Sequence, residues 1–115
     1  MQNSDNKIRT YLGFSLKSGK IVLGTDDIGN VKKGAYLILA DENLGATAKK
    51  RLRAAAERLL CPLYFCSNAE EGGLGAALCR PAVKAAAIKD KNLAKAAQEA
   101  VSGNEMWKLY SGGEI

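Results

Sequence analysis

Short apolar runs recur along this chain of 115 residues, and the segments between them space their apolar residues as helices do. Such runs, bounded by polar residues and turns, are typical of strands that are covered on both faces. They occupy residues 21–23, 36–40, 63–66 and 83–88. The last run is rich in alanine and is equally compatible with a helix, so its assignment as a strand depends on the alternation. Strands that alternate with helices over one domain's length predict an α/β fold, here a three-layer α-β-α sandwich around a small mixed sheet of about four strands.

Capping residues and glycines mark the ends of the expected helices. The first helix begins near residues 5–6 and stops at Gly19, and the second is short, with Thr25 as its cap. Residues 46–60 carry the strongest helical pattern, and Asp90 or Asn92 begins the last helix. A further helix is expected between Ser67 and Leu78.

Positive charge is concentrated in the body of the chain. The net charge is +5 overall, with +7 in residues 1–95 and −2 in residues 96–115. A basic body suggests a polyanionic partner, most simply nucleic acid, although a solvated basic surface would have the same composition. We therefore divide the chain into a domain at residues 1–101 and an acidic, glycine-bearing C-terminal tail at residues 102–115. Trp107 in this tail either packs back on the domain or contacts a partner.

One helix is especially basic. Its cations are Lys49, Lys50, Arg51, Arg53 and Arg58. The same two interpretations apply to it, a nucleic-acid or ribosome contact or a solvated face.

Several function classes are disfavoured by composition. The chain has no histidine, which excludes a standard Ser-His-Asp or Cys-His site and removes the commonest metal ligand. Its three cysteines contain no CxxC pair, which fits a reducing compartment and no structural metal. No spacing requires the acids Asp26, Asp27, Asp41 and Glu42 to converge. No apolar run has the length of a membrane helix, and no apolar signal core is apparent. We expect a cytoplasmic, monomeric protein that is not an enzyme and has no cofactor or metal.

A series of short motifs adds to this prediction. They are Leu12-Gly13, Ser18-Gly19-Lys20, the buried run 37–41, Thr47-Ala48-Lys49-Lys50, Leu74-Gly75-Ala76-Ala77, the run 83–88, Asp90, and Leu93-Ala94-Lys95. Their order and spacing over residues 6–100 resemble the ribosomal protein L-seven-Ae / L-thirty-e superfamily, most closely its bacterial YlxQ-like branch. The resemblance implies an α-β-α sandwich that binds RNA, typically at kink-turns, with the ribosome as a candidate partner.

The resemblance also implies where RNA would bind. In that family the start of the second helix and the loop before the last central strand form one RNA-binding surface. The matching positions here are Gly24, Thr25, Asp26 and Asp27, together with residues 79–82. We expect the first four to lie next to bases, because amide and carboxylate groups can accept hydrogen bonds from exposed base amino groups. The expected phosphate contacts are Lys20, Lys32, Lys33 and Arg80, and the expected apolar loop against the RNA is Pro81, Ala82 and Val83.

An alternative remains for the same residues. Thr25, Asp26 and Asp27 are ordinary capping residues, and Asn30 falls near the position where the family carries a lysine. A relative that had lost kink-turn binding and acquired acids would be a protein-interaction module of the same fold. A continuous positive rim around Asp26 and Arg80 would favour RNA, whereas an acidic or apolar patch would favour a protein partner.

Overall fold

The computed structural model describes residues 3–67, 73–78, 80 and 82–111, and the expected loop residue Pro81 lies outside them. The helices are α1 (Asn3–Ser18), α2 (Thr25–Gly29), α3 (Ala46–Leu59), α4 (Gly73–Leu78) and α5 (Lys91–Ser102). The strands are β1 (Ile21–Leu23), β2 (Leu37–Asp41), β3 (Leu63–Cys66), β4 (Ala85–Ile88) and β5 (Trp107–Ser111). Helices and strands therefore alternate along the chain as the apolar runs predict.

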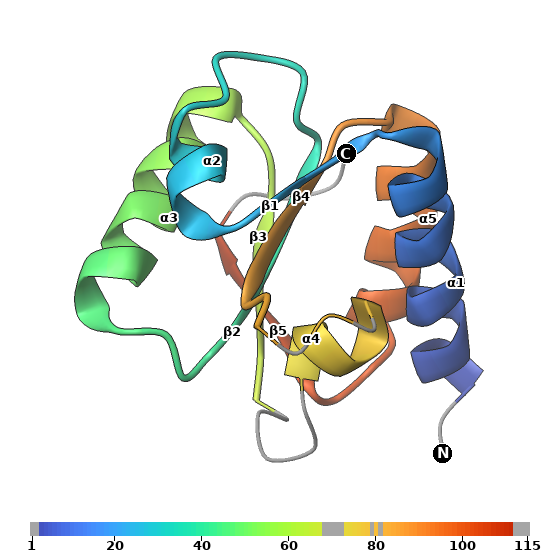
Figure 1. Cartoon of the computed structure of the whole chain (residues 1–115). Helices are drawn as coiled ribbons and strands as arrows, with labels where there is room; N and C mark the ends of the chain where they lie inside the picture. Colours follow the sequence, from blue (N-terminus) through green and yellow to red (C-terminus); the bar gives the residue numbers. More distant parts are fainter. Residues whose placement is uncertain (1–2, 68–72, 79, 81, 112–115) are drawn as a thin grey trace.

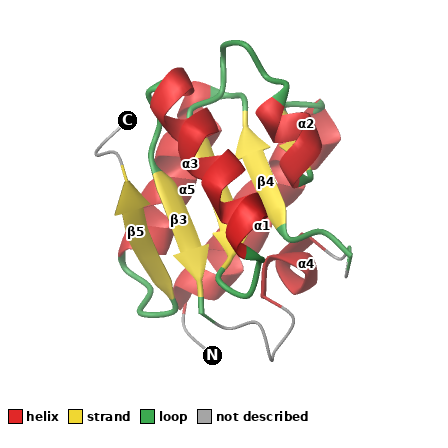
Figure 2. Ribbon diagram, turned by 90° about the vertical axis from the view of Figure 1, so that its left-hand side faces the viewer, coloured by secondary structure: helices red, strands yellow, loops and turns green. Residues whose placement is uncertain are grey.

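The sheet is mixed, with the strand order β1-β4-β2-β3-β5. Only the β2–β3 pair is parallel among these neighbours, and the other pairs are antiparallel. The expectation of about four strands was one short, because β5 adds to the edge beside β3 (Figure 2). This strand comes from the segment 102–115. Lys108, Leu109 and Tyr110 of this strand are exposed, so it lacks the continuous buried apolar run that marks a central strand.

Two hydrophobic cores separate three layers, which confirms the predicted sandwich. One core joins α1, α4 and α5 to the sheet, and the other joins α2 and α3 to its opposite face (Figure 1). Alternation along β2 divides its side chains between them, with Leu37 and Leu39 in the first core and Ile38 and Ala40 in the second. The alanines of β4 are fully covered, so small side chains let both helical layers approach the sheet closely.

Two helix ends also match the expectations. Asp90 caps α5, since its carboxylate accepts a hydrogen bond of 2.9 Å from the Leu93 N–H. Gly19 follows the last residue of α1 with a φ of 71°, a left-handed conformation that glycine adopts at low cost.

Trp107 is only 8% exposed and belongs to the α1/α4/α5 core, so it packs back on the domain. Within the described residues, none of the helices is both long and apolar enough to cross a membrane.

Candidate functional site

The strand order brings three distant segments to one end of the sheet. Because β4 is antiparallel to both β1 and β2, the start of β4 lies between the ends of these two strands. The Gly24 N–H donates a hydrogen bond of 2.9 Å to the Ala85 carbonyl, and the Asp41 N–H donates one of 2.9 Å to the Lys84 carbonyl. The start of α2, the β2–α3 connection and the loop before β4 therefore meet.

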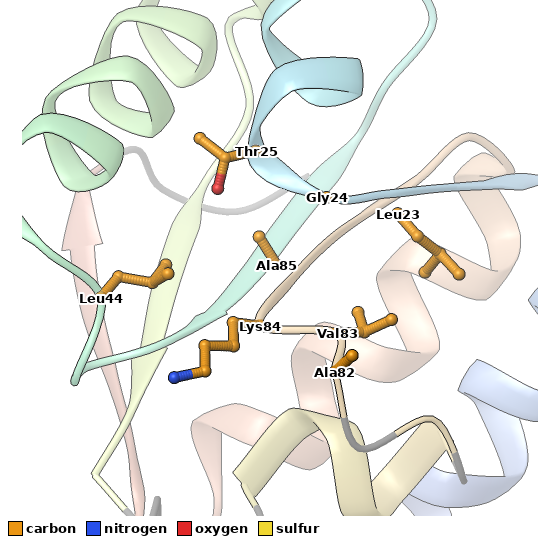
Figure 3. A pocket seen from close by; sticks show the side chains of 8 residues that line it. All are labelled: Leu23, Gly24, Thr25, Leu44, Ala82, Val83, Lys84 and Ala85. Atoms are coloured by element: carbon orange, nitrogen blue, oxygen red, sulfur yellow. The ribbon is translucent and has the colours of Figure 1, made fainter.

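A pocket of about 330 Å³ lies at this junction. Its walls are mainly apolar, with one hydroxyl and one ammonium group (Figure 3). The lining residues are Leu23, Gly24, Thr25, Leu44, Ala82, Val83, Lys84 and Ala85. The exposed Lys84 side chain extends toward the β2–α3 connection that carries Leu44. Four of the expected RNA-binding residues, Gly24, Thr25, Ala82 and Val83, are thus brought together.

The start of α2 differs from the expectation in one respect. Thr25 is the first helical residue and not the cap, because Gly24 holds the N-cap position and no side chain supplies a capping hydrogen bond. The φ of Gly24 is 92°, which side-chain-bearing residues rarely adopt, so glycine is required where β1 turns into α2. Thr25 is consequently available to line the pocket.

The two aspartates of α2 lie on its exposed side. The Asp26 carboxylate forms an ion pair with the Arg51 guanidinium of α3, and both side chains are largely exposed. Farther along, Arg58 Nη2 donates hydrogen bonds to the carbonyls of Gly29 at 3.1 Å and Val31 at 2.9 Å. Two cations of the basic helix therefore contact α2 and the residues that follow it, a role within the fold that the run of cations alone does not predict.

Three expected phosphate contacts lie at the other end of the sheet. Lys20 precedes β1, whose first residue pairs with Ile88, and four residue steps along this extended segment place it about 13 Å from Gly24. Lys32 and Lys33 lie in the segment that leads from α2 to Tyr36, whose N–H donates to the Ile88 carbonyl at 2.9 Å. The structure therefore does not join these lysines to the pocket.

Arg80 begins the loop that leads to the pocket. Its N–H donates a hydrogen bond of 2.9 Å to the Gly75 carbonyl in α4, and its carbonyl accepts one of 3.0 Å from the Val83 N–H. The Arg80 side chain is exposed. Arg80 thus lies one turn away from two lining residues, Ala82 and Val83.

The carboxylate of Asp41, at the end of β2 next to the pocket, is buried. Asp41 Oδ1 accepts a hydrogen bond of 2.8 Å from the Leu74 N–H, which ties the end of β2 to α4. Burial raises the pKa of Asp41, and the Leu74 hydrogen bond and the nearby Lys84 charge offset part of that increase. The hydrogen bond to α4 gives Asp41 a structural role.

Two of the three cysteines, Cys61 and Cys66, belong to the residues that the structure describes. Cys61 and Cys66 are buried, and burial raises the pKa of the Cys61 thiol to about 11, so this thiol is protonated at neutral pH. Across residues 3–67, 73–78, 80 and 82–111, no three Cys, Asp or Glu side chains gather in a way that could hold a metal ion.

Sequence reasoning missed three residues of the site. Lys84 directly follows the expected loop residue Val83, and it is the cation that lines the pocket. Leu44 follows the polar end of β2, and only the position of β4 beside β2 brings it to the pocket. Arg51 was noted in the basic helix, but no local pattern links it to Asp26, which is 25 positions away.

Comparisons with known proteins support the fold alone. No protein-family model matches the chain, and no curated protein matches it. Solved structures do resemble it, including one titled "The structure of a protein with unknown function from Bacillus halodurans C", with a TM-score of 0.69 and 17% sequence identity. That similarity covers 84% of this chain and 97% of the other.

Proposed function

We propose that this protein binds structured RNA, with kink-turns as the first candidate, at the pocket between α2 and the loop before β4. The observation that carries the proposal is the meeting of Gly24 and Thr25 with Ala82 and Val83 around one pocket. The resemblance described above had implied that these two segments share an RNA-binding surface. The proposed role is binding and not catalysis.

The chemistry of the pocket is suited to a distorted RNA helix. Apolar walls can receive the face of a base or a ribose, and the Thr25 hydroxyl can donate to or accept from a base edge. The Lys84 ammonium supplies a positive charge for a phosphate at the same opening. Phosphate contacts position an RNA and base contacts select it, so both kinds of group are needed.

The negative charge beside the pocket is less of an obstacle than the sequence suggests. Arg51 balances the charge of Asp26 at the rim. Arg80 adds an exposed cation at the start of the neighbouring loop. In this proposal Lys20, Lys32 and Lys33 contact a more distant part of the same RNA, because they lie at the far end of β1.

The test is a titration against a kink-turn RNA and a duplex of equal length without the sheared G·A pairs. We expect tighter binding to the kink-turn. Lys84→Gln should weaken it several-fold and reduce the slope of log K against log salt by about 0.9, as expected for one lost phosphate contact. Thr25→Val, which keeps the side-chain shape, should reduce the preference for the kink-turn.

Lys95→Gln is the matched control, since this exposed lysine lies on α5 in the opposite layer. Equal losses from Lys84→Gln and Lys95→Gln would contradict the proposed site. Equal and steeply salt-dependent binding of both RNAs would show a nonspecific basic surface.

The apolar lining of the pocket favours a second candidate, a protein-interaction module of the same fold. In that case an apolar side chain of a protein partner would fill the pocket. Absence of binding to either RNA would favour this candidate.

A further inference from the structure

A second surface lies on the other flank of α3, where cations and aromatic rings are interleaved. Lys49 Nζ lies 5.5 Å from the centroid of the Phe65 ring, and Arg53 Cζ lies 5.3 Å from that of Tyr110. The two rings meet edge to face, with centroids 5.4 Å apart. Arg53 Nη1 also donates a hydrogen bond of 2.8 Å to the Tyr110 hydroxyl. We call Lys49, Arg53, Phe65, Lys108 and Tyr110 the cation–aromatic face.

Strand register adds a third cation to this face. Lys108 pairs with Phe65, whose side chain lies in the core beneath α3, so Lys108 projects on the same side of the sheet. Lys108 is exposed, at the edge where β5 lies beside β3 (Figure 2). An acidic residue, Glu57, lies one helical turn beyond Arg53 on the same side of α3.

The Tyr110 ring is only partly buried in the fold. Phe65 is 7% exposed, whereas Tyr110 is 49% exposed, so about half of its surface remains open to a ligand. A half-open ring surrounded by cations is the composition of surfaces that bind single-stranded nucleic acid, in which bases stack on rings and cations track the phosphates. Guanidinium groups also stack on bases, so Arg53 can serve both purposes.

We propose that the cation–aromatic face binds a single-stranded segment of RNA, with one base stacked against Tyr110 or Arg53 and phosphates near Lys49 and Lys108. This goes beyond the proposed function, because the face and the pocket lie on opposite flanks of α3. Arg51 points from α3 toward α2, and Arg53 points from α3 toward β5. An RNA bound at the pocket could therefore extend an unpaired strand across α3 to this face.

The experiment measures binding of a labelled oligouridine of about ten nucleotides by fluorescence anisotropy, since surfaces of this kind tolerate any base sequence. Tyr110→Ala should weaken binding about fivefold or more, the loss that one stacked base causes, and Tyr110→Phe should stay within about twofold of wild type. Lys108→Gln should reduce the salt slope by about 0.7, the value for one phosphate contact on a single strand.

Two controls match these changes in the opposite layer. Phe14→Ala removes an aromatic side chain of α1 that is 51% exposed, and Lys95→Gln removes an exposed charge of α5. Both should leave binding unchanged. Thermal unfolding of each variant checks that β5 remains in place, and Lys108→Gln tests the face even if Tyr110→Ala disturbs this edge strand.

A second titration separates this proposal from the proposed function. Adding an unpaired extension to the kink-turn RNA should tighten binding, and only variants of the cation–aromatic face should remove that gain. In this proposal oligouridine binds at the cation–aromatic face and not at the pocket, so its binding can be observed even where the kink-turn proposal fails.

Three results would overturn the proposal. One is no measurable oligouridine binding by the wild-type protein at low salt. Another is losses in Tyr110→Ala and Lys108→Gln no larger than those in the two controls. The third is a dimer that these variants dissociate without any change in oligouridine binding, which would make the exposed edge of β5 an interface between copies of the chain.

Discussion

Arg51 and Asp26 provide the sharpest test of the candidate interface, because their ion pair decides whether a negative charge faces the RNA. Arg51→Gln keeps a long side chain of similar helix propensity and removes the charge. Asp26→Asn keeps the shape of the aspartate and removes its charge. Measuring both single variants and the double variant gives a double-mutant cycle, which isolates the interaction between the two side chains.

The effect on stability should be small. The two side chains are 58% and 82% exposed, so solvent screens their attraction. Exposed pairs typically contribute about 0.2–1 kcal/mol to the free energy of unfolding. For a domain of this size, either single variant should lower Tm by only about 1–5 °C. A larger loss would mean that the pair holds α2 in place.

The effect on RNA binding should be larger in Arg51→Gln. The uncompensated Asp26 carboxylate would repel a phosphate about 6 Å away by about 0.7 kcal/mol in bulk water and about 2.8 kcal/mol at an effective dielectric constant near 20. These values correspond to a weakening of about 3- to 100-fold. Adding Asp26→Asn should restore most of the affinity, because the repelling charge is then gone.

The assay is the kink-turn titration at about 0.15 M salt, where the Debye length is about 8 Å, repeated at about 1 M, where it is about 3 Å and the differences should shrink. Strictly additive effects of the two substitutions would refute the argument that Arg51 masks Asp26. A loss caused by Asp26→Asn in both backgrounds would instead assign the Asp26 carboxylate a direct contact with a base.

Other changes test the framework around the site. Arg58→Met should destabilise the domain by about 1 kcal/mol, because the carbonyls of Gly29 and Val31 lose a charged donor, and urea unfolding beside the wild type would measure this. The folded pKa of Cys61 is about 11 against 9.0 for a free thiol, so its contribution to stability falls by about 2–3 kcal/mol as pH rises from 9 to above 11. In Cys61→Ala this part of the alkaline loss should disappear, and a parallel pH dependence in both proteins would contradict it. Because burial raises the pKa of Asp41, its contribution to stability falls as pH rises from 3.8 through the folded value, so the stability of Asp41→Asn relative to wild type should increase over that range.

The sequence predicts the central strands and the covering helices of this fold better than it predicts the edge strand β5. Central strands and the helices that cover them have continuous or periodic apolar patterns, so their presence could be inferred locally. β5 could not be inferred this way, because Leu109 and Tyr110 are each about half exposed. A strand of this kind is defined by its pairing with β3, which is a contact between distant parts of the chain.

The candidate site was predicted only in part for a related reason. The two segments that meet at the pocket were identified, but three of the four expected phosphate contacts, Lys20, Lys32 and Lys33, are close to Gly24 only in sequence. Lys20 is four positions from Gly24, yet an extended strand carries it to the other end of the sheet. Lys84 is distant in sequence and lines the pocket with Gly24, because β4 is inserted between β1 and β2.

The distribution of charge on α3 shows why net charge alone could not locate a binding surface. Its buried stripe, which includes Leu52, Ala55 and Ala56, faces the sheet and leaves two flanks and an outer side. Arg51 and Arg58 on one flank are engaged by α2, and Lys49 and Arg53 on the other lie over aromatic rings. Lys50 remains on the outer side. Some cations of α3 therefore contact α2, others form part of the cation–aromatic face, and Lys50 lies between these two groups. Charge reversal should consequently affect folding and RNA binding differently at each position.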